Sequence, residues 1–338
     1  MKTVIFIITK SEVGGAQRWV YEQAKIISND CKVILVTSED GWLTKQTVFS
    51  EVKLLPGIAK LIRPLELFKL IKIIKQNSAF SVVASSANAG VYARLARLFV
   101  AFKCVYVSHG WSCLYNGGSL KKVFCKVEKY LSFLTDTIWC ISKSDRDKAV
   151  NIIGIKENKI TMSLNSITPL KPRGDADFHG RVLFVGRLTY PKRPDLIADV
   201  VARDKRYSLD IIGDGDLYPE LYRLYGECDN ISFLGEIAEF RDFNKYDVFV
   251  LTSDSEGLPM SALEAASAGV PMILSNVGGC FEVINGENGI LVKNEALDIS
   301  EALNIVADNY AYYLDNAIKY RREFDISAKA HEYKCIIL

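Results

Sequence analysis

The sequence predicts an α/β protein with two doubly wound domains in series, each a parallel sheet covered by helices on both faces. Its 338 residues exceed what one ordinary hydrophobic core uses, so two domains are the natural expectation. Short apolar runs of strand length alternate with helical stretches over residues 1–165. The alternation starts again near residue 180, after a stretch with Pro169, Pro172 and Gly174 that is typical of an interdomain linker.

The first domain is expected to span residues 1–165. Its first apolar run, Thr3–Thr9, is only seven residues long and is followed by no small-residue cleavage site, which favours a buried strand over a signal peptide. The expected strands are Val4–Ile8, Val33–Val36, Val52–Leu54, Ser81–Ala84, Cys104–Ser108 and Thr137–Ile141. The expected helices are Ala16–Ser28, Pro64–Gln76, Gly90–Phe99, Leu120–Leu134 and Ser144–Ile152.

The second domain is expected to span residues 166–310, and residues 311–338 are expected to form a helical segment. The expected strands are Val182–Val185, Leu209–Ile212, Ile231–Leu234, Val248–Leu251 and Met272–Leu274. The expected helices are Pro194–Ala202, Leu217–Tyr225, Phe240–Lys245 and Met260–Ala268. Because doubly wound sheets bind ligands at the carboxyl ends of their strands, we expect the ligand in the cleft between the two domains.

Composition and charge narrow the class of protein. The eight cysteines are scattered without a Cys-x-x-Cys pair, which favours a reduced cytoplasmic location over a disulfide scaffold or a zinc site. No segment reaches the roughly twenty apolar residues that a membrane span needs. Residues 1–165 carry 24 Lys/Arg against 12 Asp/Glu, whereas the remainder carries 18 against 28. We expect the basic first half to be drawn to anionic lipid or another polyanion, but the sequence has no recognised nucleic-acid motif.

The stretch Val248–Val292 carries the strongest functional signal. It reads as a buried strand, a loop Thr252–Leu258, the helix Met260–Ala268, a left-handed cap at Gly269 and a second strand, with Pro259 at a good first helical position. A glycine turn, Val277-Gly278-Gly279, closes this strand–helix–strand unit.

Two carboxylates stand out in this unit, Glu256 just before the helix and Glu264 within it. The helix is apolar or small on nearly every face, so it is expected to be buried, and a charge on it needs a partner. Side chains lean toward the helix start, where the amides of Gly257 to Met260 and the helix dipole favour an anion. The pattern therefore indicates a phosphate at the helix tip, with hydroxyl groups near both carboxylates.

These residues resemble a known family. Glu256-Gly257-Leu258-Pro259, Leu263-Glu264-Ala265, Ala268-Gly269-Val270-Pro271 and Val277-Gly278-Gly279 resemble the nucleotide-sugar site of family 4 retaining glycosyltransferases, which have the GT-B fold of two Rossmann-like domains. The resemblance covers most of residues 1–292 and is densest in Val182–Val292. It implies that Glu256 binds hydroxyls of the donor sugar, that Glu264 binds the ribose, and that the last helix returns to the first domain. Asn276 departs from the aspartate common in relatives, which leaves the sugar preference in doubt.

Two glycines near the N-terminus complete the expected donor-binding set. Gly14 and Gly15 follow the first strand and would let the backbone approach a phosphate or sugar, although an ordinary strand-to-helix turn is the alternative. The expected donor-binding residues are Gly14, Gly15, Gly257, Leu258, Pro259, Met260 and Glu264.

Three more residues join Glu256 as expected catalytic residues: His109, Arg187 and Lys192. Arg187 and Lys192 follow a predicted strand, where fixed cations would stabilise a departing diphosphate, although solvated cations are the usual alternative. His109 closes another predicted strand, and the resemblance places such a histidine beside the donor sugar; a structural hydrogen-bonding role is the alternative.

No metal and no cofactor is expected. Gly213-Asp214-Gly215-Asp216 lacks the ligand count and the distal glutamate of a calcium loop and reads as a turn. No Asp-x-Asp triplet of the chain offers the metal-binding motif of the other main glycosyltransferase fold, and Arg187, Lys192 and the helix end can supply the charge that a metal would provide.

The sequence thus predicts a retaining, metal-independent glycosyltransferase that moves a hexose or N-acetylhexosamine from a nucleotide-diphosphate sugar, most simply a UDP-sugar, to a glycan. A lipid-linked acceptor in bacterial lipopolysaccharide or O-antigen assembly is expected, and Ile58–Gln76 and Leu120–Leu134, rich in lysine and apolar residues, would hold the enzyme peripherally on an anionic membrane surface. The alternatives are a nucleotide-sugar epimerase on the same fold, for which no acid/base carboxylate set is evident, and a two-domain binding protein without enzymatic activity.

Overall fold

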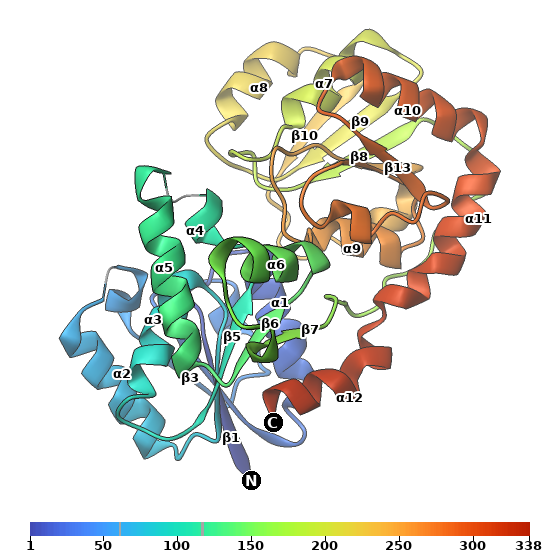
Figure 1. Cartoon of the computed structure of the whole chain (residues 1–338). Coiled ribbons are helices and arrows are strands. Elements are labelled where there is room, and N and C mark those ends of the chain that lie inside the picture. The colour runs from blue at the N-terminus through green and yellow to red at the C-terminus, as the bar shows by residue number, and fades with distance from the viewer. Residues whose placement is uncertain (61, 116–117) are drawn as a thin grey trace. The chain divides into compact units, whose positions relative to one another are not determined.

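The computed structural model describes residues 1–60, 62–115 and 118–338, and these form two compact α/β units (Figure 1). Unit 1 comprises Met1–Asn165 and Ser327–Leu338, and unit 2 comprises Ser166–Ile326. Residue 61, inside the expected basic stretch Ile58–Gln76, lies outside the described residues.

Unit 1 is built on a seven-stranded parallel sheet in the order β3-β2-β1-β4-β5-β6-β7. The strands are β1 (Lys2–Ile7), β2 (Cys31–Thr37), β3 (Glu51–Leu54), β4 (Ser81–Ala84), β5 (Lys103–Ser108), β6 (Thr137–Cys140) and β7 (Ile160–Met162). The helices are α1 (Gly15–Ile27), α2 (Pro64–Gln76), α3 (Ala87–Ala96), α4 (Ser112–Tyr115), α5 (Lys121–Leu131), α6 (Lys143–Lys148) and α12 (Ile326–Ile337). The central strands β1, β4 and β5 are mostly apolar and are buried except at the first residues of β1 and β5, because helices cover both faces of the sheet.

Helices α2, α3 and α5 lie next to one another over one face of this sheet (Figure 1). On the other face, Trp139 of β6 contacts both Trp19 of α1 and Tyr333 of α12, with ring centroids 5.0 Å apart in each case. Tyr333 also donates its hydroxyl to the carbonyl of Leu164. The C-terminal segment that belongs to unit 1 therefore begins at Ser327, later than residue 311.

Unit 2 has a six-stranded parallel sheet in the order β10-β9-β8-β11-β12-β13. The strands are β8 (Arg181–Val185), β9 (Ser208–Ile212), β10 (Ile231–Gly235), β11 (Val248–Leu251), β12 (Met272–Ser275) and β13 (Gly289–Val292). The helices are α7 (Pro194–Arg203), α8 (Tyr218–Tyr225), α9 (Met260–Ser267), α10 (Ala296–Asp308) and α11 (Tyr310–Tyr320).

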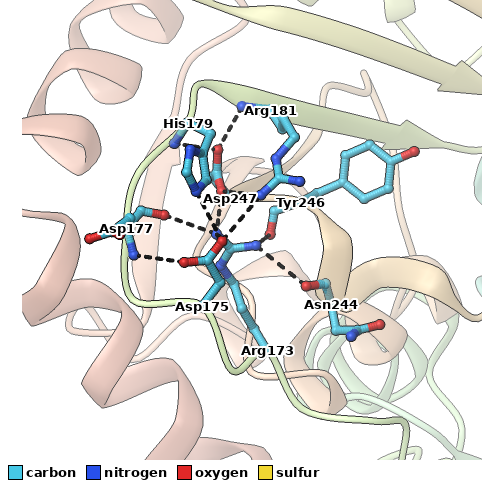
Figure 2. Close-up of polar contacts among 8 residues, drawn as sticks. All are labelled: Arg173, Asp175, Asp177, His179, Arg181, Asn244, Tyr246 and Asp247. Carbon is cyan, nitrogen blue, oxygen red and sulfur yellow. Dashed lines mark hydrogen bonds and ion pairs between the residues drawn. The ribbon is translucent and has the colours of Figure 1, made fainter.

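The stretch expected as a linker is bound firmly to unit 2 (Figure 2). The side chain of Arg173 is fully buried, pairs with the equally buried Asp247 and donates to the carbonyl of Tyr246 at 3.1 Å. The other carboxylate oxygen of Asp247 accepts the backbone N–H groups of His179 and Arg181 at 2.9 and 2.7 Å. A buried arginine needs a counter-charge and acceptors of this kind, and the network fixes residues 173–181 to the starts of β8 and β11.

Some local predictions were wrong or incomplete. The helix predicted over Phe240–Lys245 is one 3₁₀ turn, Asp242–Lys245, because the extended Tyr246 leads directly into β11 and leaves no room for a second turn. Helix α3 begins at Ala87 rather than Gly90, and Gly90 lies inside it, where a Cβ would meet the ring of Tyr106 at 2.5 Å. The short strands β7 and β13 and the helices α4 and α10 were not predicted.

The cysteines and the helices show two further features. All eight cysteines are free thiols. Across the described ranges, no helix combines the length and the apolar character that crossing a membrane requires.

Candidate active site

The predicted site residues of unit 2 follow two adjacent strands at its switch point. Strand β8 pairs in parallel with β9 on one side and β11 on the other, so the chain connections leave in opposite directions between β8 and β11. Such a point leaves a crevice at the carboxyl ends of the strands, where open α/β sheets bind ligands. Lys192 comes from the loop after β8 and Glu256 from the loop after β11.

The backbone brings Lys192 and Glu256 together. Lys192 forms an antiparallel bridge with Ser253, while Asp254 donates its N–H to the carbonyl of Pro191 at 2.8 Å. The ammonium of Lys192 then pairs with the carboxylate of Glu256, and both side chains are largely buried. A mostly buried ion pair held by two tethered loops presents fixed charges rather than mobile surface groups.

A glycine turn supports the backbone of Glu256. Gly278 has φ +55°, and a Cβ at this position would lie 1.7 Å from the carbonyl oxygen of Glu256. Gly279 donates its N–H to the carbonyl of Gly257 at 2.7 Å. The turn after β12 therefore packs directly on the Glu256 loop, and only glycine fits at residue 278.

Helix α9 begins beside this loop. Pro259 has the extended backbone of a cap residue (φ −69°, ψ 124°), so it precedes the helix rather than taking the first helical position as predicted. The left-handed cap predicted at Gly269 is confirmed by its φ of +65°. Along an otherwise buried helix, Met260, Ser261 and Glu264 are half-buried, so they share one accessible side near its N-terminus.

Arg187 lies in the loop after β8, next to a backbone contact that depends on glycine. Gly213 has φ +143°, and a Cβ there would lie 1.9 Å from the carbonyl oxygen of Gly186. Leu188 donates its N–H to the carbonyl of Asp214 at 2.9 Å. The expected Gly-Asp-Gly turn thus supports the loop that carries Arg187. Arg187 is exposed, and among the described residues no carboxylate forms an ion pair with it.

Two residues that the sequence did not indicate hold the glutamate loop in place. Ser275, at the end of β12, accepts the N–H of Ser253 at 2.9 Å. Asn294, after β13, donates to the carbonyl of Ser253 at 3.0 Å and to the carboxylate of Asp254 at 2.8 Å. Both residues lie at the carboxyl ends of strands, Ser275 as the last residue of β12 and Asn294 two residues after β13, and that position is the signal that could have found them.

His109 occupies the corresponding edge of unit 1. It follows β5, and its Nε2 lies 2.7 Å from the hydroxyl of Ser85, which follows the neighbouring strand β4. The ring of Trp19 packs edge-on against it, with centroids 5.2 Å apart. Removal of the imidazole from water lowers the pKa of His109 to about 4. His109 is therefore neutral at neutral pH and acts as a hydrogen-bonding group.

Gly14 and Gly15 lie between β1 and α1, at the switch point of unit 1, where β1 adjoins both β2 and β4. Gly14 is the cap of α1 with extended backbone (φ −178°), and Gly15 is its first residue. The nearest atom to a Cβ at Gly14 would be the end of the Gln17 side chain, at 2.6 Å. The fold does not require a left-handed glycine at residue 14, so the predicted role in close ligand approach stays a prediction.

Comparisons with known proteins bear on both units. A family model described as "Glycosyltransferase Family 4" matches residues 13–169, and one described as "Glycosyl transferases group 1" matches residues 179–309. The chain is 54% identical over its whole length to the O-antigen biosynthesis glycosyltransferase WbnH of Escherichia coli, all of which is covered. The chain belongs to glycosyltransferase family 4.

More distant proteins share the architecture. An E. coli protein named UDP-Gal:alpha-D-GlcNAc-diphosphoundecaprenol alpha-1,3-galactosyltransferase is 26% identical over 84% of this chain and 79% of its own length. The structure of HepE from Anabaena, solved with UDP and glucose, superposes with a TM-score of 0.85 at 17% identity and covers 97% of both chains. The predicted GT-B fold is confirmed.

Within this family 4 glycosyltransferase, the structure therefore assembles the predicted residues in two groups. Lys192, Glu256 and Gly257 lie together at the switch point of unit 2, beside the helix that carries Glu264. His109 lies at the carboxyl edge of unit 1.

Proposed function

We propose that this glycosyltransferase moves a hexose or N-acetylhexosamine from a UDP-sugar to a lipid-carrier-linked glycan during assembly of O-antigen or a related bacterial surface polysaccharide. The observation that carries the proposal is the fixed Lys192–Glu256 pair beside the N-terminus of α9, at the switch point of unit 2. The 54% sequence identity to WbnH supports a role in polysaccharide assembly. The name of the galactosyltransferase relative supports a UDP-sugar donor and a lipid diphosphate acceptor.

Unit 2 would bind the donor. Glu264, reachable from the N-terminal side of α9, would accept the two ribose hydroxyls, while Glu256 would bind hydroxyls of the sugar. The donor would lie against the start of α9 and the turn before it, where it would contact Leu258, Pro259 and Met260. The amides of this turn and the helix dipole suit the diphosphate.

Arg187 and Lys192 would stabilise the leaving group. The diphosphate gains negative charge as the bond to the sugar breaks, so cations already in place favour the transition state over the ground state. Because the tethered loops hold Lys192 beside Glu256, its position needs little reorganisation. Side chains and helix amides would supply this charge, so neither a metal ion nor a cofactor enters the proposal.

Unit 1 would bind the acceptor, and its residues Gly14, Gly15 and His109 would contact the donor sugar. Since Nε2 of His109 is engaged by Ser85, Nδ1 is the ring nitrogen that remains for a sugar hydroxyl. Transfer would proceed with retention: the acceptor hydroxyl attacks from the face that the diphosphate leaves, and a phosphate oxygen of the leaving group takes its proton.

A donor panel tests the proposal. Thermal stabilisation of the purified protein is measured with UDP-galactose, UDP-glucose, their N-acetylhexosamine counterparts and GDP-mannose, with Glu264→Gln as the site variant and Glu287→Gln, on an exposed loop, as its control. We expect a selective shift with one UDP-sugar that Glu264→Gln removes and Glu287→Gln keeps. No shift with any nucleotide or nucleotide sugar in the folded protein would refute the donor site.

The reaction itself separates the proposal from its alternatives. Incubation of the selected donor with a diphosphate-linked N-acetylhexosamine acceptor should give a new glycoside whose anomeric configuration, read by proton NMR, matches the donor, and EDTA should leave the rate unchanged. Conversion of the donor into its epimer would indicate an epimerase, and binding without transfer or donor hydrolysis would indicate a binding protein.

An anionic membrane surface is proposed as a further partner of unit 1, whose residues 1–165 carry twice as many basic as acidic residues, 24 against 12. A lipid-linked acceptor would be presented at such a surface.

A further inference from the structure

Helix α5 turns an apolar ridge away from the sheet of unit 1. Leu120, Val123, Val127 and Tyr130, which we call the apolar ridge, recur at helical spacing and are all exposed, Val123 by 53% and Tyr130 by 68%. The inward side of the helix is instead formed by Glu128 and Leu131, which are buried. A surface helix normally buries its apolar side, so this arrangement needs an external partner.

A row of lysines runs beside the ridge. Lys122, Lys126 and Lys129 follow one another at intervals of four and three residues and are exposed. The acidic residue of α5, Glu128, points inward and binds Arg94 of α3. The exposed surface of α5 is therefore apolar and basic and carries no acidic side chain of its own.

Helix α2, on the same face of the sheet, repeats the pattern. The outer face of α2 exposes Leu65 and Phe68 together with Lys72 and Lys75. Its acidic residue, Glu66, is largely buried and pairs with Lys69 at 2.8 Å. Since α2 and α5 flank α3 over the same face of the sheet, the basic and apolar residues share one side of the unit (Figure 1).

The charge selects among possible occupants. A second copy of this chain would bring two lysine rows against each other, which like-charge repulsion opposes. An anionic bilayer offers apolar acyl chains to the ridge and phosphates to the lysines. With the ridge buried in the bilayer, the long aliphatic part of each lysine side chain would let its ammonium reach the headgroups. Aromatic residues such as Tyr130 also favour the boundary between headgroups and acyl chains.

We propose that α5 is the membrane-docking element of this enzyme, with the apolar ridge inserted at the boundary between headgroups and acyl chains, and Lys122, Lys126 and Lys129 against anionic headgroups. The surface of α2 would add further charge at the same bilayer. This inference rests on the proposed function, because a lipid-linked acceptor gives the enzyme a reason to dock.

Vesicle co-sedimentation tests the charge and the ridge separately. The full chain is mixed with vesicles of phosphatidylethanolamine and phosphatidylglycerol, or of phosphatidylcholine alone, without any donor. Lys122→Glu/Lys126→Glu removes charge, and Val123→Asn/Val127→Asn removes the ridge. The controls are Lys171→Glu/Lys319→Glu and Leu224→Asn, at exposed positions of unit 2. Circular dichroism verifies folding.

We expect the wild type and controls to bind the anionic vesicles and to bind phosphatidylcholine weakly. Because each lysine near an anionic surface contributes about fivefold to partitioning, the lysine variant should bind at least about 25-fold more weakly. The ridge variant should lose about tenfold, and raised salt should weaken the wild type.

A depth measurement distinguishes insertion from attraction alone. Tyr130→Trp should be quenched by lipids brominated along the acyl chain, over the background of the wild-type tryptophans, whereas Tyr222→Trp, an exposed tyrosine on α8, should not. Absence of binding to anionic vesicles, or equal binding by all variants, would overturn the proposal. The wild type could instead fail to bind vesicles and form a dimer that the ridge substitutions dissociate, as measured by light scattering. That result would assign the apolar ridge to contact with a second copy of the chain. Stabilisation by UDP-sugars, measured without lipid, reports the proposed function independently.

Discussion

The buried ion pair beneath α5 provides a quantitative test of how this helix is held. Arg94 is 1% exposed and Glu128 9%, and they are joined by two hydrogen bonds of 2.7 and 3.3 Å. Arg94 also donates its Nε–H to the carbonyl of Gly90 at 2.8 Å, and its guanidinium lies 4.2 Å from the ring centroid of Tyr106. Burial opposes the charged form of Arg94 and is the largest single influence, but the charge and the hydrogen bonds of Glu128, with smaller contributions from Tyr106 and Cys104, together outweigh it and keep the pKa of Arg94 above its ordinary value.

Glu128→Gln should destabilise unit 1 strongly, because it leaves a buried guanidinium without a counter-charge. Breaking a buried pair from one side costs about 3–5 kcal/mol, which corresponds to a fall in melting temperature of roughly 6–20 °C for a domain of this size. Arg94→Met/Glu128→Leu, which removes both charges and keeps the volume apolar, should be close to neutral or stabilising. Arg97→Met, at the C-cap of α3, breaks a more exposed pair with Asp136 and should cost at most about 1 kcal/mol.

Urea unfolding followed by tryptophan fluorescence measures this unit selectively, since all four tryptophans of the chain, at residues 19, 42, 111 and 139, lie in unit 1. The two units need not unfold together, so a signal confined to one of them is needed to extract its free energy. A cost for Glu128→Gln no larger than that of Arg97→Met would refute the reasoning. So would a double variant as unstable as the single one, because the penalty would then come from lost packing rather than from unpaired charge.

Further predictions concern the site. Lys192→Met should lower kcat/KM for the UDP-sugar by at least about 100-fold through loss of charge stabilisation at the leaving diphosphate, whereas Lys245→Met, on an exposed turn of unit 2, should leave it unchanged in initial-rate assays. Gly278→Ala should abolish thermal stabilisation by the donor, because its Cβ would displace the Glu256 carbonyl; retained stabilisation would contradict the tight packing of this turn. The pKa of His109 is about 4 in the folded chain against 6.5 as its ordinary value, so its stabilising contribution is complete above pH 6.5 and falls as the pH drops toward 4. The difference in unfolding free energy between wild type and His109→Gln should therefore shrink over this range, by at most about 3 kcal/mol, and a constant difference would count against a neutral imidazole at this half-buried position.

Local signals in the sequence predicted most of the fold. Apolar runs such as Val248–Leu251 predicted the buried strands, and the left-handed cap at Gly269 followed from a glycine placed directly after a helical stretch. The strands that were missed lack a clear apolar run: β7 has three residues with a threonine at its centre, and β13 begins with a glycine. The same local logic predicted the order of strand, loop and helix around Glu256.

The supporting contacts of the site could not be predicted in the same way, because they join distant parts of the chain. Ser85 lies 24 residues before His109, and Asn294 lies 41 residues after the Ser253 carbonyl that it binds. The local sequence around one residue of such a pair does not identify its partner. The sequence indicates that polar residues follow the strands, but only the strand order shows which of them meet.

Helix α5 shows where periodicity alone misleads. An amphipathic stretch such as Leu120–Leu134 is ordinarily read as an apolar side on the core and a charged side in water. In the structure Val123 and Val127 are exposed to solvent and Glu128 is buried against the sheet side of the unit. Burial of Glu128 is possible because Arg94, 34 residues earlier, binds its carboxylate in place of water. The inward side is thus specified by a charge pair, which leaves the apolar side available for a bilayer. The Arg94→Met/Glu128→Leu variant should then keep both its fold and its vesicle binding, since the ridge and the lysine row are unchanged in it.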